Sequence, residues 1–325
     1  MALLEVENLV VRLGTARGPA EAVRGVSFSL GRGETLGLIG ESGSGKSMTA
    51  LALLGLLPAN ATVSGQIRLD GRELVGLAED ELCAVRGERI ATVFQEPMTA
   101  LNPLHRVGRQ VAEALTVHNR MTRAAAREEA IRLLDRVGLP QARRRAEAFP
   151  HQLSGGQRQR VTIAMALACG PDILIADEPT TALDVTIQSQ ILDLIAELVE
   201  ERRMALILIS HDLGVIAENV DRMLVMYGGS VVESGPTAEV FRRMGHPYTQ
   251  GLLAARPRMG ATRGTRLATI SGTVPDLADI PPGCPFAARC PLAIEACRAA
   301  MPAPQMVGPG HVARCIRLDA ALEHA

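Results

Sequence analysis

The sequence predicts an α/β fold, and three observations support this expectation. Apolar runs of strand length alternate with helical segments over much of the 325-residue chain. A glycine-rich loop joins one of these runs to a helix, and a helical region and a cysteine-containing tail interrupt the alternation. With 47% hydrophobic residues, the chain is long and apolar enough for about two buried cores.

The glycine-rich loop reads Gly-Glu-Ser-Gly-Ser-Gly-Lys-Ser over residues 40–47, which matches the phosphate-binding pattern G-x-x-x-x-G-K-[ST]. Lys46 is the only lysine of the chain, and every other basic residue is arginine. Coding composition explains a shortage of lysine but not the position of the one that remains. A compact ammonium group suits contact with two phosphates, so the loop is predicted to bind a nucleotide.

The segments on both sides of this loop fit the prediction. Residues 35–39 are apolar and short enough for a buried strand, and Met48 to Leu57 are predicted to form a helix that stops at Pro58. Backbone N–H groups and the helix N-terminus favour a bound anion, and Ser47 is expected to ligate Mg²⁺. The predicted nucleotide-binding residues of the loop are Gly40, Ser42, Gly43, Ser44, Gly45, Lys46, Ser47 and Met48.

The order of patterns along the chain predicts its organisation. Strand patterns occur at 3–13, 22–30 and 66–70, and again at 172–177, 205–210 and 222–227. Helical periodicity dominates from Pro97 to about Gly170, which indicates an inserted helical region, and another helix is predicted at about 186–202. The last roughly ninety residues are rich in Pro and Gly, so a separate, loop-rich appendage is expected there.

Two adjacent carboxylates, Asp177 and Glu178, end the apolar run at 173–176. Asp177 is expected to hold Mg²⁺, directly or through water. Glu178 is expected to orient and deprotonate the water that attacks the γ-phosphate. An ordinary acidic strand end is the alternative, and the phosphate-binding loop upstream disfavours it.

A second glycine loop, Leu-Ser-Gly-Gly-Gln at 153–157, precedes a helical run that ends at Leu167. The N-terminus of a helix attracts anions, so this loop is a second candidate for phosphate contact. The nearby Arg143-Arg144-Arg145 is interpreted as a solvated face.

The composition excludes several classes of protein. The apolar runs are far shorter than the roughly 20 residues of a membrane helix, and the N-terminus lacks the pattern of a secretion signal, so a cytoplasmic protein is expected. A net charge of −1 and an aromatic set of two Tyr, five Phe and no Trp give no reason to expect a nucleic-acid partner.

At these motifs the chain resembles the ATP-binding cassette (ABC) family, whose signature sequence LSGGQ is present unchanged at 153–157. The resemblance implies an ATPase with a P-loop NTPase core of the RecA-like type, an antiparallel β subdomain and an inserted helical subdomain that carries the signature. It also implies that two cassettes pack head to tail. The phosphate-binding loop of one and the signature loop of the other then enclose each ATP.

The resemblance also implies roles for individual residues. Gln95 would sense Mg²⁺ and the attacking water, His211 would be the switch histidine near the γ-phosphate, and the loop Ala182-Leu183-Asp184 would join the two subunits' sites. The catalytic residues expected are Glu178, His211 and Gln95, and the Mg²⁺ residues are Ser47, Gln95 and Asp177. Five further residues of this chain would contact the ATP that is bound at the other cassette's phosphate-binding loop. They are Ser154, Gly155, Gly156, Gln157 and Asp184.

A closer resemblance, over essentially the whole chain, is to the ATP-binding subunits of bacterial oligopeptide and dipeptide importers. It rests on FQEPMTALNP at 94–103, ADEPTTALDV at 176–185, His246-Pro247-Tyr248, GCPF at 283–286 and RCP at 289–291. It implies a nucleotide-binding domain over 1–235, with the helical signature subdomain at about 97–170, and a C-terminal extension over 236–325.

The same resemblance implies a peripheral protein at the cytoplasmic face of the cell membrane. Its partners would be a second ATP-binding subunit, favoured to be a different chain, two membrane-spanning permease subunits and, indirectly, an extracytoplasmic peptide-binding protein. The segment at 94–103 is expected where the cassette meets its membrane partner. Nickel or another small solute is an alternative to peptide, since the other subunits choose the solute.

A soluble ABC ATPase that acts on nucleic acid or ribosomes is a more distant alternative. Such proteins commonly hold two cassettes or long coiled-coil or basic insertions, and this sequence has neither. An exporter is also disfavoured, since exporter cassettes are often fused to membrane spans.

Leu13 is a departure from the family pattern. Many cassettes stack the adenine on an aromatic side chain of the first β segment, and Leu13 lies in the equivalent stretch. It offers apolar contact without an aromatic face, so weaker or less base-selective nucleotide binding is expected.

Four tail cysteines, Cys284, Cys290, Cys297 and Cys315, are spaced C-x5-C-x6-C-x17-C. In a cytosolic protein this indicates metal binding rather than disulfides. The gaps are wider than those of usual zinc knuckles, and two of the cysteines precede proline, as one does in bacterial ferredoxin runs. Some importer cassettes of this type carry a [4Fe–4S] cluster, which the sequence therefore favours in a structural role. Zinc and unligated buried thiols remain alternatives.

Overall fold

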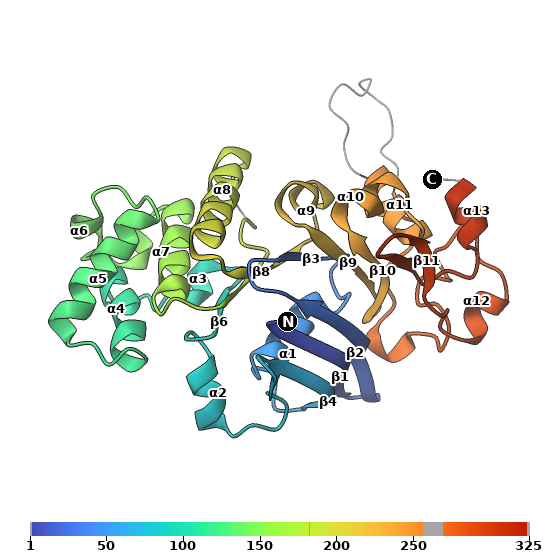
Figure 1. Ribbon diagram of the computed structural model, residues 1–325, viewed down its shortest axis with the longest axis horizontal. Coiled ribbons are helices and arrows are strands. Elements are labelled where there is room, and N and C mark those ends of the chain that lie inside the picture. Colours follow the sequence, from blue (N-terminus) through green and yellow to red (C-terminus); the bar gives the residue numbers. More distant parts are fainter. Residues whose placement is uncertain (1, 182, 256–268, 324–325) are drawn as a thin grey trace. The chain divides into compact units, whose positions relative to one another are not determined.

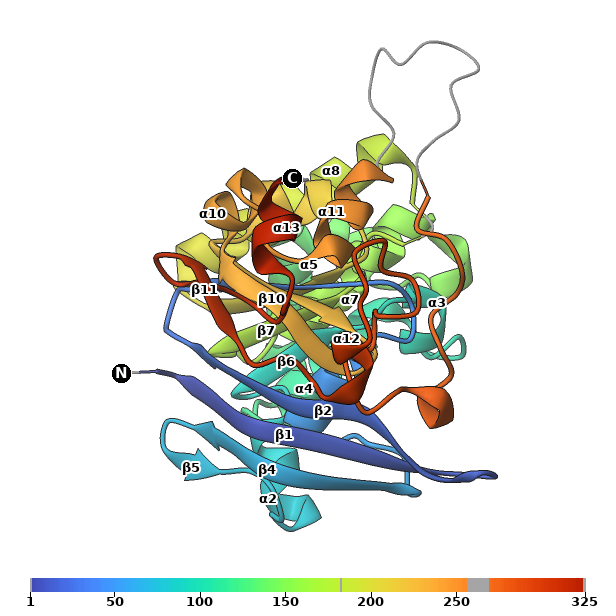
Figure 2. The ribbon, with the colours of Figure 1, turned by 90° about the vertical axis from the view of Figure 1, so that its right-hand side faces the viewer.

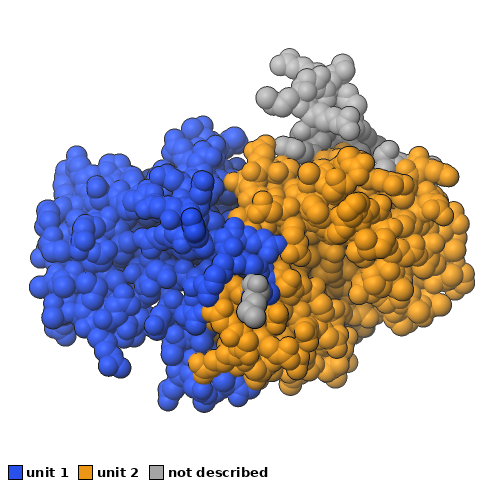
Figure 3. Space-filling view, in the orientation of Figure 1, with its two compact units in different colours: residues 1–2, 30–34, 76–208 blue, residues 3–29, 35–75, 209–325 orange. Residues whose placement is uncertain are grey.

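The computed structural model describes residues 2–181, 183–255 and 269–323, and the chain divides into two compact units (Figure 3). Unit 1 consists mainly of residues 30–34 and 76–208. Unit 2 consists of residues 3–29, 35–75 and 209 onward. Within the described residues, no helix combines the length and the apolar character that a membrane crossing requires.

The first sheet of unit 2 has the strand order β2-β1-β4-β5, and Figure 2 shows β2, β1 and β4 side by side. Its strands are β1 (Leu4–Thr15), β2 (Gly18–Leu30), β4 (Ala61–Leu69) and β5 (Arg72–Glu73). β1 and β4 are antiparallel, with a β-bulge between Glu7 and Val10. Alternate β1 residues on both sides of the bulge are buried, as a sheet with one covered face requires.

The second set of strands in unit 2 follows the order β3-β9-β10-β12-β11. These strands are β3 (Thr35–Ile39), β9 (Arg222–Tyr227), β10 (Ser230–Pro236), β12 (His311–Ala313) and β11 (Gln305–Gly308). β3 runs parallel to β9, whereas β10, β12 and β11 are antiparallel to their neighbours. The pairing of β12 with β10 makes part of the C-terminal tail a continuation of this sheet, which the sequence patterns do not indicate.

The helices of unit 2 are short, and Figure 1 shows α10, α11 and α13 near the tail strands. They are α1 (Lys46–Leu53), α9 (Leu213–Asn219), α10 (Thr237–Arg242), α11 (Pro247–Ala254), the 3₁₀ turn Leu277–Asp279, α12 (Ala296–Ala299) and α13 (Leu318–Glu323).

Helix α1 ends four residues before Leu57, where the sequence pattern predicts its end. Gly55 adopts φ of +61°, the left-handed conformation that glycine enters without steric cost. The N–H of Leu56 donates to Leu51 O at 2.8 Å, and that of Gly55 to Ala52 O at 3.1 Å. This is a Schellman motif, which terminates the helix before Pro58 can.

Unit 1 contains the parallel strands β6 (Ile90–Val93) and β7 (Ile173–Asp177), with β8 (Ala205–Ser210) on the other side of β7. The first four residues of β7 and all of β8 are buried, as expected for strands covered on both faces. The predicted strands at 172–177 and 205–210 are thus confirmed to within one residue. Of the two carboxylates predicted to be functional, Asp177 is the last residue of β7 and Glu178 directly follows the strand.

The helical region between β6 and β7 forms one packed group, which Figure 1 shows in green. Unit 1 contains α2 (Glu79–Val85), α3 (Pro97–Ala100), α4 (Val107–Val117), α5 (Arg123–Arg136), α6 (Ala142–Arg145), the 3₁₀ turn Pro150–Gln152, α7 (Gly155–Leu167) and α8 (Val185–Arg202). α4, α5 and α7 contact one another, and Val111, Ala130 and Val161 on these helices are fully buried. Helices α7 and α8 begin at the signature loop and at Asp184, so their N-termini position two of the predicted motifs.

Candidate nucleotide-binding site

The phosphate-binding loop lies in unit 2 between β3 and α1, the strand and helix predicted for it. Gly45 caps the helix with φ of +100°, and a side chain there would place its Cβ 2.7 Å from Ala22 O. At Gly40 a Cβ would lie 2.2 Å from Met226 O. Both positions therefore require glycine, since backbone atoms cannot move aside. Ser42, Gly43 and Ser47 are exposed, Met48 is half-buried and Ser44 is buried.

Lys46 holds the loop together from inside. Its side chain is buried, and Nζ donates to Gly40 O at 2.7 Å, to Glu41 O at 3.0 Å and to Ser44 Oγ at 3.3 Å. An ammonium group on a flexible stem can satisfy three acceptors arranged in this way, whereas a planar guanidinium cannot follow them as closely. The single lysine of the chain thus organises the loop in which phosphate is predicted to bind.

The residues at the end of β7 in unit 1 are brought together with Gln95. Gln95 Nε2 donates to Glu178 Oε2 at 2.9 Å, and Thr181 Oγ1 donates to the same oxygen at 3.1 Å. Glu178 has φ of +45°, a left-handed conformation that is rare outside glycine and asparagine. Strained backbone of this kind is typical of functional sites, where surrounding contacts hold a side chain in place. Asp177 ends β7 itself and is half-buried.

The signature loop forms the N-terminus of α7. Ser154 Oγ accepts from Gln157 N at 3.4 Å, and Gln157 Oε1 accepts from Ser154 N at 3.2 Å, which is a capping box. Arg145 Nη1 also donates to Gln157 Oε1 at 3.0 Å. The expectation that 143–145 form a solvated face is therefore wrong for Arg145, which is half-buried and supports the signature glutamine.

The two signature glycines pack against the segment that starts α8. A Cβ at Gly156 would lie 2.7 Å from Ile187 Cγ2, and one at Gly155 would lie 3.2 Å from Leu183 Cδ2. Asp184 caps α8, and its Oδ1 accepts from Ile187 N at 3.0 Å. Ala182, of the same predicted loop, lies outside the described residues. The signature loop and the Asp184 segment are thus adjacent parts of unit 1.

The remaining predicted residues lie in unit 2. His211 follows β8 directly and is exposed. Leu13 is half-buried near the end of β1, where it pairs with Ala61 of β4.

The four tail cysteines line one pocket of unit 2, although their spacing in the sequence is irregular. Cys284 N donates to Cys297 O at 2.8 Å, which joins the first and third cysteine segments. Backbone N–H groups also point at sulfur: Ile294 N lies 3.5 Å from Cys297 Sγ, and Cys284 accepts from the Phe286 N–H. Burial raises the pKa of the Cys284 thiol to about 11. Nevertheless, within the part of the chain that the structure describes, no three His, Cys, Asp or Glu side chains are grouped so that they could hold a metal ion.

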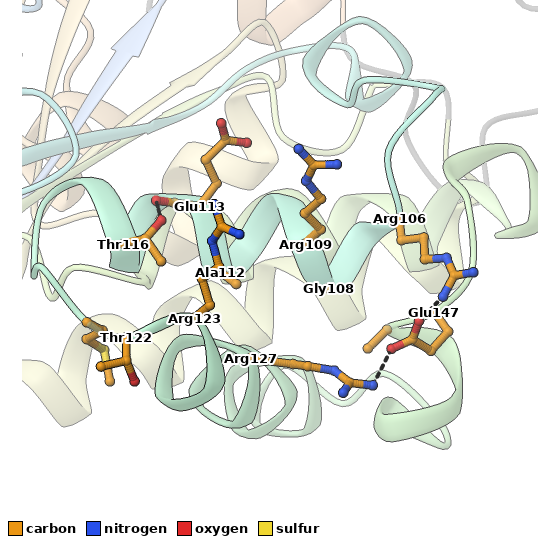
Figure 4. Close-up of a pocket in the computed structure, with 12 residues that line it drawn as sticks. Arg106, Gly108, Arg109, Ala112, Glu113, Thr116, Thr122, Arg123, Arg127 and Glu147 are labelled. Atoms are coloured by element: carbon orange, nitrogen blue, oxygen red, sulfur yellow. Dashed lines mark hydrogen bonds and ion pairs between the residues drawn. The ribbon is translucent and has the colours of Figure 1, made fainter.

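A larger pocket lies in the helical region of unit 1, and Figure 4 shows its lining. Glu147 bridges Arg106 and Arg127 there, and Arg109 and Arg123 add further positive charge. No predicted site residue lines this pocket.

Comparison with known proteins identifies the same segments. The family "ABC transporter" matches residues 23–181, and "Oligopeptide/dipeptide transporter, C-terminal region" matches residues 232–297. The oligopeptide transport ATP-binding protein OppD of Escherichia coli is 51% identical over 316 residues, which cover 97% of this chain and 93% of that protein. A putative peptide import ATP-binding protein of Brucella abortus is 51% identical and covers 97% of both chains.

OppD of Mycobacterium tuberculosis is 52% identical over 318 residues, but this chain spans only 52% of its length. Among solved structures, the dimeric ATP-binding cassette MJ0796, in a post-hydrolysis state bound to ADP and Pi, matches with a TM-score of 0.65 and 31% identity. That match covers 72% of this chain and 98% of the cassette. The chain therefore belongs to the ABC transporter family of ATPases, in the group whose C-terminal region is that of oligopeptide and dipeptide transporters.

Proposed function

We propose that this chain is the ATP-hydrolysing subunit of an importer that carries dipeptides and oligopeptides across the cytoplasmic membrane. The observation that carries the proposal is the 51% identity to the Escherichia coli oligopeptide transport protein over nearly the full length of both chains. The aligned region includes the C-terminal tail, and this region distinguishes peptide transporters from other cassettes. The protein would act at the cytoplasmic face of the membrane, bound to two permease subunits and a second ATP-binding subunit.

Within the nucleotide-binding domain, proposed to span 1–235, the site residues take separate roles. Lys46 and the loop N–H groups would bind the phosphates, and Ser47, Asp177 and Gln95 would be the residues for Mg²⁺, which would supply neutralisation of phosphate charge. Glu178, held by Gln95 and Thr181, orients and deprotonates the attacking water. Leu13 contacts the adenine and His211 contacts the γ-phosphate.

The signature loop and Asp184 are proposed to complete the ATP site of a second cassette. Helix α7 begins at Gly155, and the backbone N–H groups of its N-terminus would contact a phosphate. The dimeric state of the related cassette MJ0796 supports such an arrangement.

The segment at 94–103 is proposed to meet the permease. Two of its large apolar side chains are exposed, Phe94 by 41% and Met98 by 56%, and Leu104, directly after it, is exposed by 80%. Apolar side chains gathered on one exposed segment are typical of a surface that a partner covers. Gln95 lies in this segment and donates a hydrogen bond to Glu178. Closure of the two-cassette dimer on ATP would therefore be transmitted through this segment to the permease.

The C-terminal extension, proposed to span 236–325, is expected to hold a [4Fe–4S] cluster on Cys284, Cys290, Cys297 and Cys315. Support comes from the pocket that the four sulfur-bearing residues share and from the backbone N–H groups directed at each of them. Such hydrogen bonds are a usual feature of protein-bound clusters. Four thiolate bonds would stabilise a segment with few regular elements, which is a structural role.

Protein purified without oxygen is expected to contain about four irons and four acid-labile sulfides per chain, with a broad visible absorption band. Cys290→Ser should lose most of the iron, because one ligand and its charge are removed. Cys83→Ser, at an exposed cysteine of unit 1, is the matched control and should keep it. Stoichiometric zinc in place of iron would identify a zinc site, and metal-free protein would mean that the four thiols are unligated.

The transported solute is tested by deleting the gene in its own host and measuring uptake of labelled tripeptide, free amino acid and nickel. Peptide uptake alone is expected to fall, and the wild-type gene, but not a Glu178→Gln variant, should restore it. Loss of nickel uptake with normal peptide uptake would favour the alternative solute and contradict the peptide assignment.

A further inference from the structure

Glu41, the second residue of the phosphate-binding loop, is bound by two residues of the C-terminal extension within unit 2. Its backbone N–H donates to Tyr248 Oη at 2.7 Å. Its carboxylate accepts two hydrogen bonds from Arg289, Nη1 to Oε2 at 2.6 Å and Nη2 to Oε1 at 3.1 Å. These residues are more than 200 positions from Glu41 in the chain, so the tail contributes directly to the loop.

Arg289 is fixed in one orientation by the surrounding backbone and aromatic rings. Besides Glu41, it donates to Ser271 O, Ile270 O and Tyr227 Oη, so five hydrogen bonds match its five N–H donors. Its side chain is only 6% exposed. A bidentate pair with a buried arginine and a half-buried carboxylate fixes geometry in a way that a fully exposed ion pair does not.

Tyr248 is equally constrained. Its ring packs against Tyr227, with centroids 4.7 Å apart, and against Phe286 at 5.2 Å, and the side chain is fully buried. The hydroxyl therefore has a defined position from which it accepts the Glu41 N–H.

The peptide group between Gly40 and Glu41 is held from both sides. Its carbonyl oxygen, Gly40 O, accepts from Lys46 Nζ at 2.7 Å, while its N–H donates to Tyr248 Oη at 2.7 Å. Hydrogen bonds at the two ends of one peptide group polarise each other and strengthen together. The next carbonyl oxygen, Glu41 O, also accepts from Lys46 at 3.0 Å. The position of Lys46 is thus linked through one peptide to the tail.

We propose that Tyr248 and Arg289 are positioning residues for ATP binding, which hold the phosphate-binding loop in its binding conformation through Glu41. The C-terminal extension would then be part of the nucleotide site as well as a site for partners or metal. This role concerns the ATPase reaction and is independent of the solute and of the cluster.

The decisive variant is Tyr248→Phe, which removes one hydroxyl and keeps the ring in its packing. The dissociation constant of a non-hydrolysable ATP analogue and the KM for ATP are expected to rise about five- to tenfold, because a hydrogen bond to the loop is lost. The kcat at saturating ATP should stay within about twofold, since ATP binding restores the loop. Melting temperature and iron content are measured on the same samples.

Gln250→Met is the matched control, since it removes side-chain hydrogen bonds from the same helix, α11, and these bonds go to Met244 O and Ala321 O rather than to the loop or Arg289. It is expected to change nucleotide affinity by less than about twofold. Glu41→Gln and Arg289→Gln should each weaken ATP binding, and the double variant should be no weaker than either alone, since both changes break one interaction.

An unchanged affinity in Tyr248→Phe would overturn the proposal. So would equal losses in Tyr248→Phe and Gln250→Met, because they would indicate general damage to the tail rather than loss of the contact with Glu41. A fall in kcat at unchanged affinity would also contradict a role in positioning the loop for binding.

Discussion

Replacing Glu178 with glutamine is expected to lower ATP turnover about 100- to 10,000-fold while ATP binding persists. Glutamine has nearly the same shape, so the change removes the proton acceptor and preserves the contact with Gln95. The strained backbone at this residue, with φ of +45°, should be unaffected because the side chain keeps its size. Turnover is measured by phosphate release, and binding by a fluorescent ATP analogue.

Glu200→Gln provides a control for this substitution, since it makes the same chemical change at an exposed position of α8. That variant should keep its turnover. If Glu178→Gln retained a rate within about threefold of wild type, Glu178 would not be the general base, whose removal costs far more.

Loss of the Lys46 ammonium is expected to weaken ATP binding by at least about 100-fold in Lys46→Met. The ammonium would make charge-assisted hydrogen bonds to two phosphates, each of which contributes about 1.5–3 kcal/mol. In the structure its three N–H donors bond Gly40 O, Glu41 O and Ser44 Oγ, so contacts with phosphate would replace part of these bonds. Titration with the non-hydrolysable analogue measures the loss, and the melting temperature reports whether the fold survives.

Two further variants separate charge from geometry. Lys46→Arg keeps the charge but replaces a compact group by a planar fork, so most of the affinity should still be lost. Arg17→Met removes an exposed cation that pairs with Asp279 and should leave binding unchanged. Full ATP affinity in Lys46→Arg would mean that charge alone determines binding at this loop.

The sequence predicts the local parts of this site well, because each motif occupies the end of a strand or the start of a helix. The phosphate-binding loop lies between β3 and α1, Asp177 and Glu178 follow β7, and Ser154 opens α7. These relations depend on residues that are close in the chain. Short-range patterns of apolar residues, glycines and capping residues are therefore sufficient to predict them.

The contacts that cross the chain could not be predicted in this way. No period or spacing relates Glu41 to Arg289, and the exposed or buried state of Arg145 depends on Gln157, twelve residues away on another helix. The convergence of four cysteines on one pocket depends in the same way on the fold of the tail. Such contacts are set by tertiary packing, which single-sequence patterns do not encode.

The most direct test of the proposed function is transport by the purified complex. The chain, tagged and purified from its own host with its partner subunits, is reconstituted into liposomes that enclose ATP, and labelled tripeptide is supplied outside with the peptide-binding protein. Uptake should require enclosed ATP and should be absent in complexes that carry Glu178→Gln. ATP-independent uptake, equal uptake with Glu178→Gln, or purification of the chain without membrane subunits would contradict a role as the ATPase of a peptide importer.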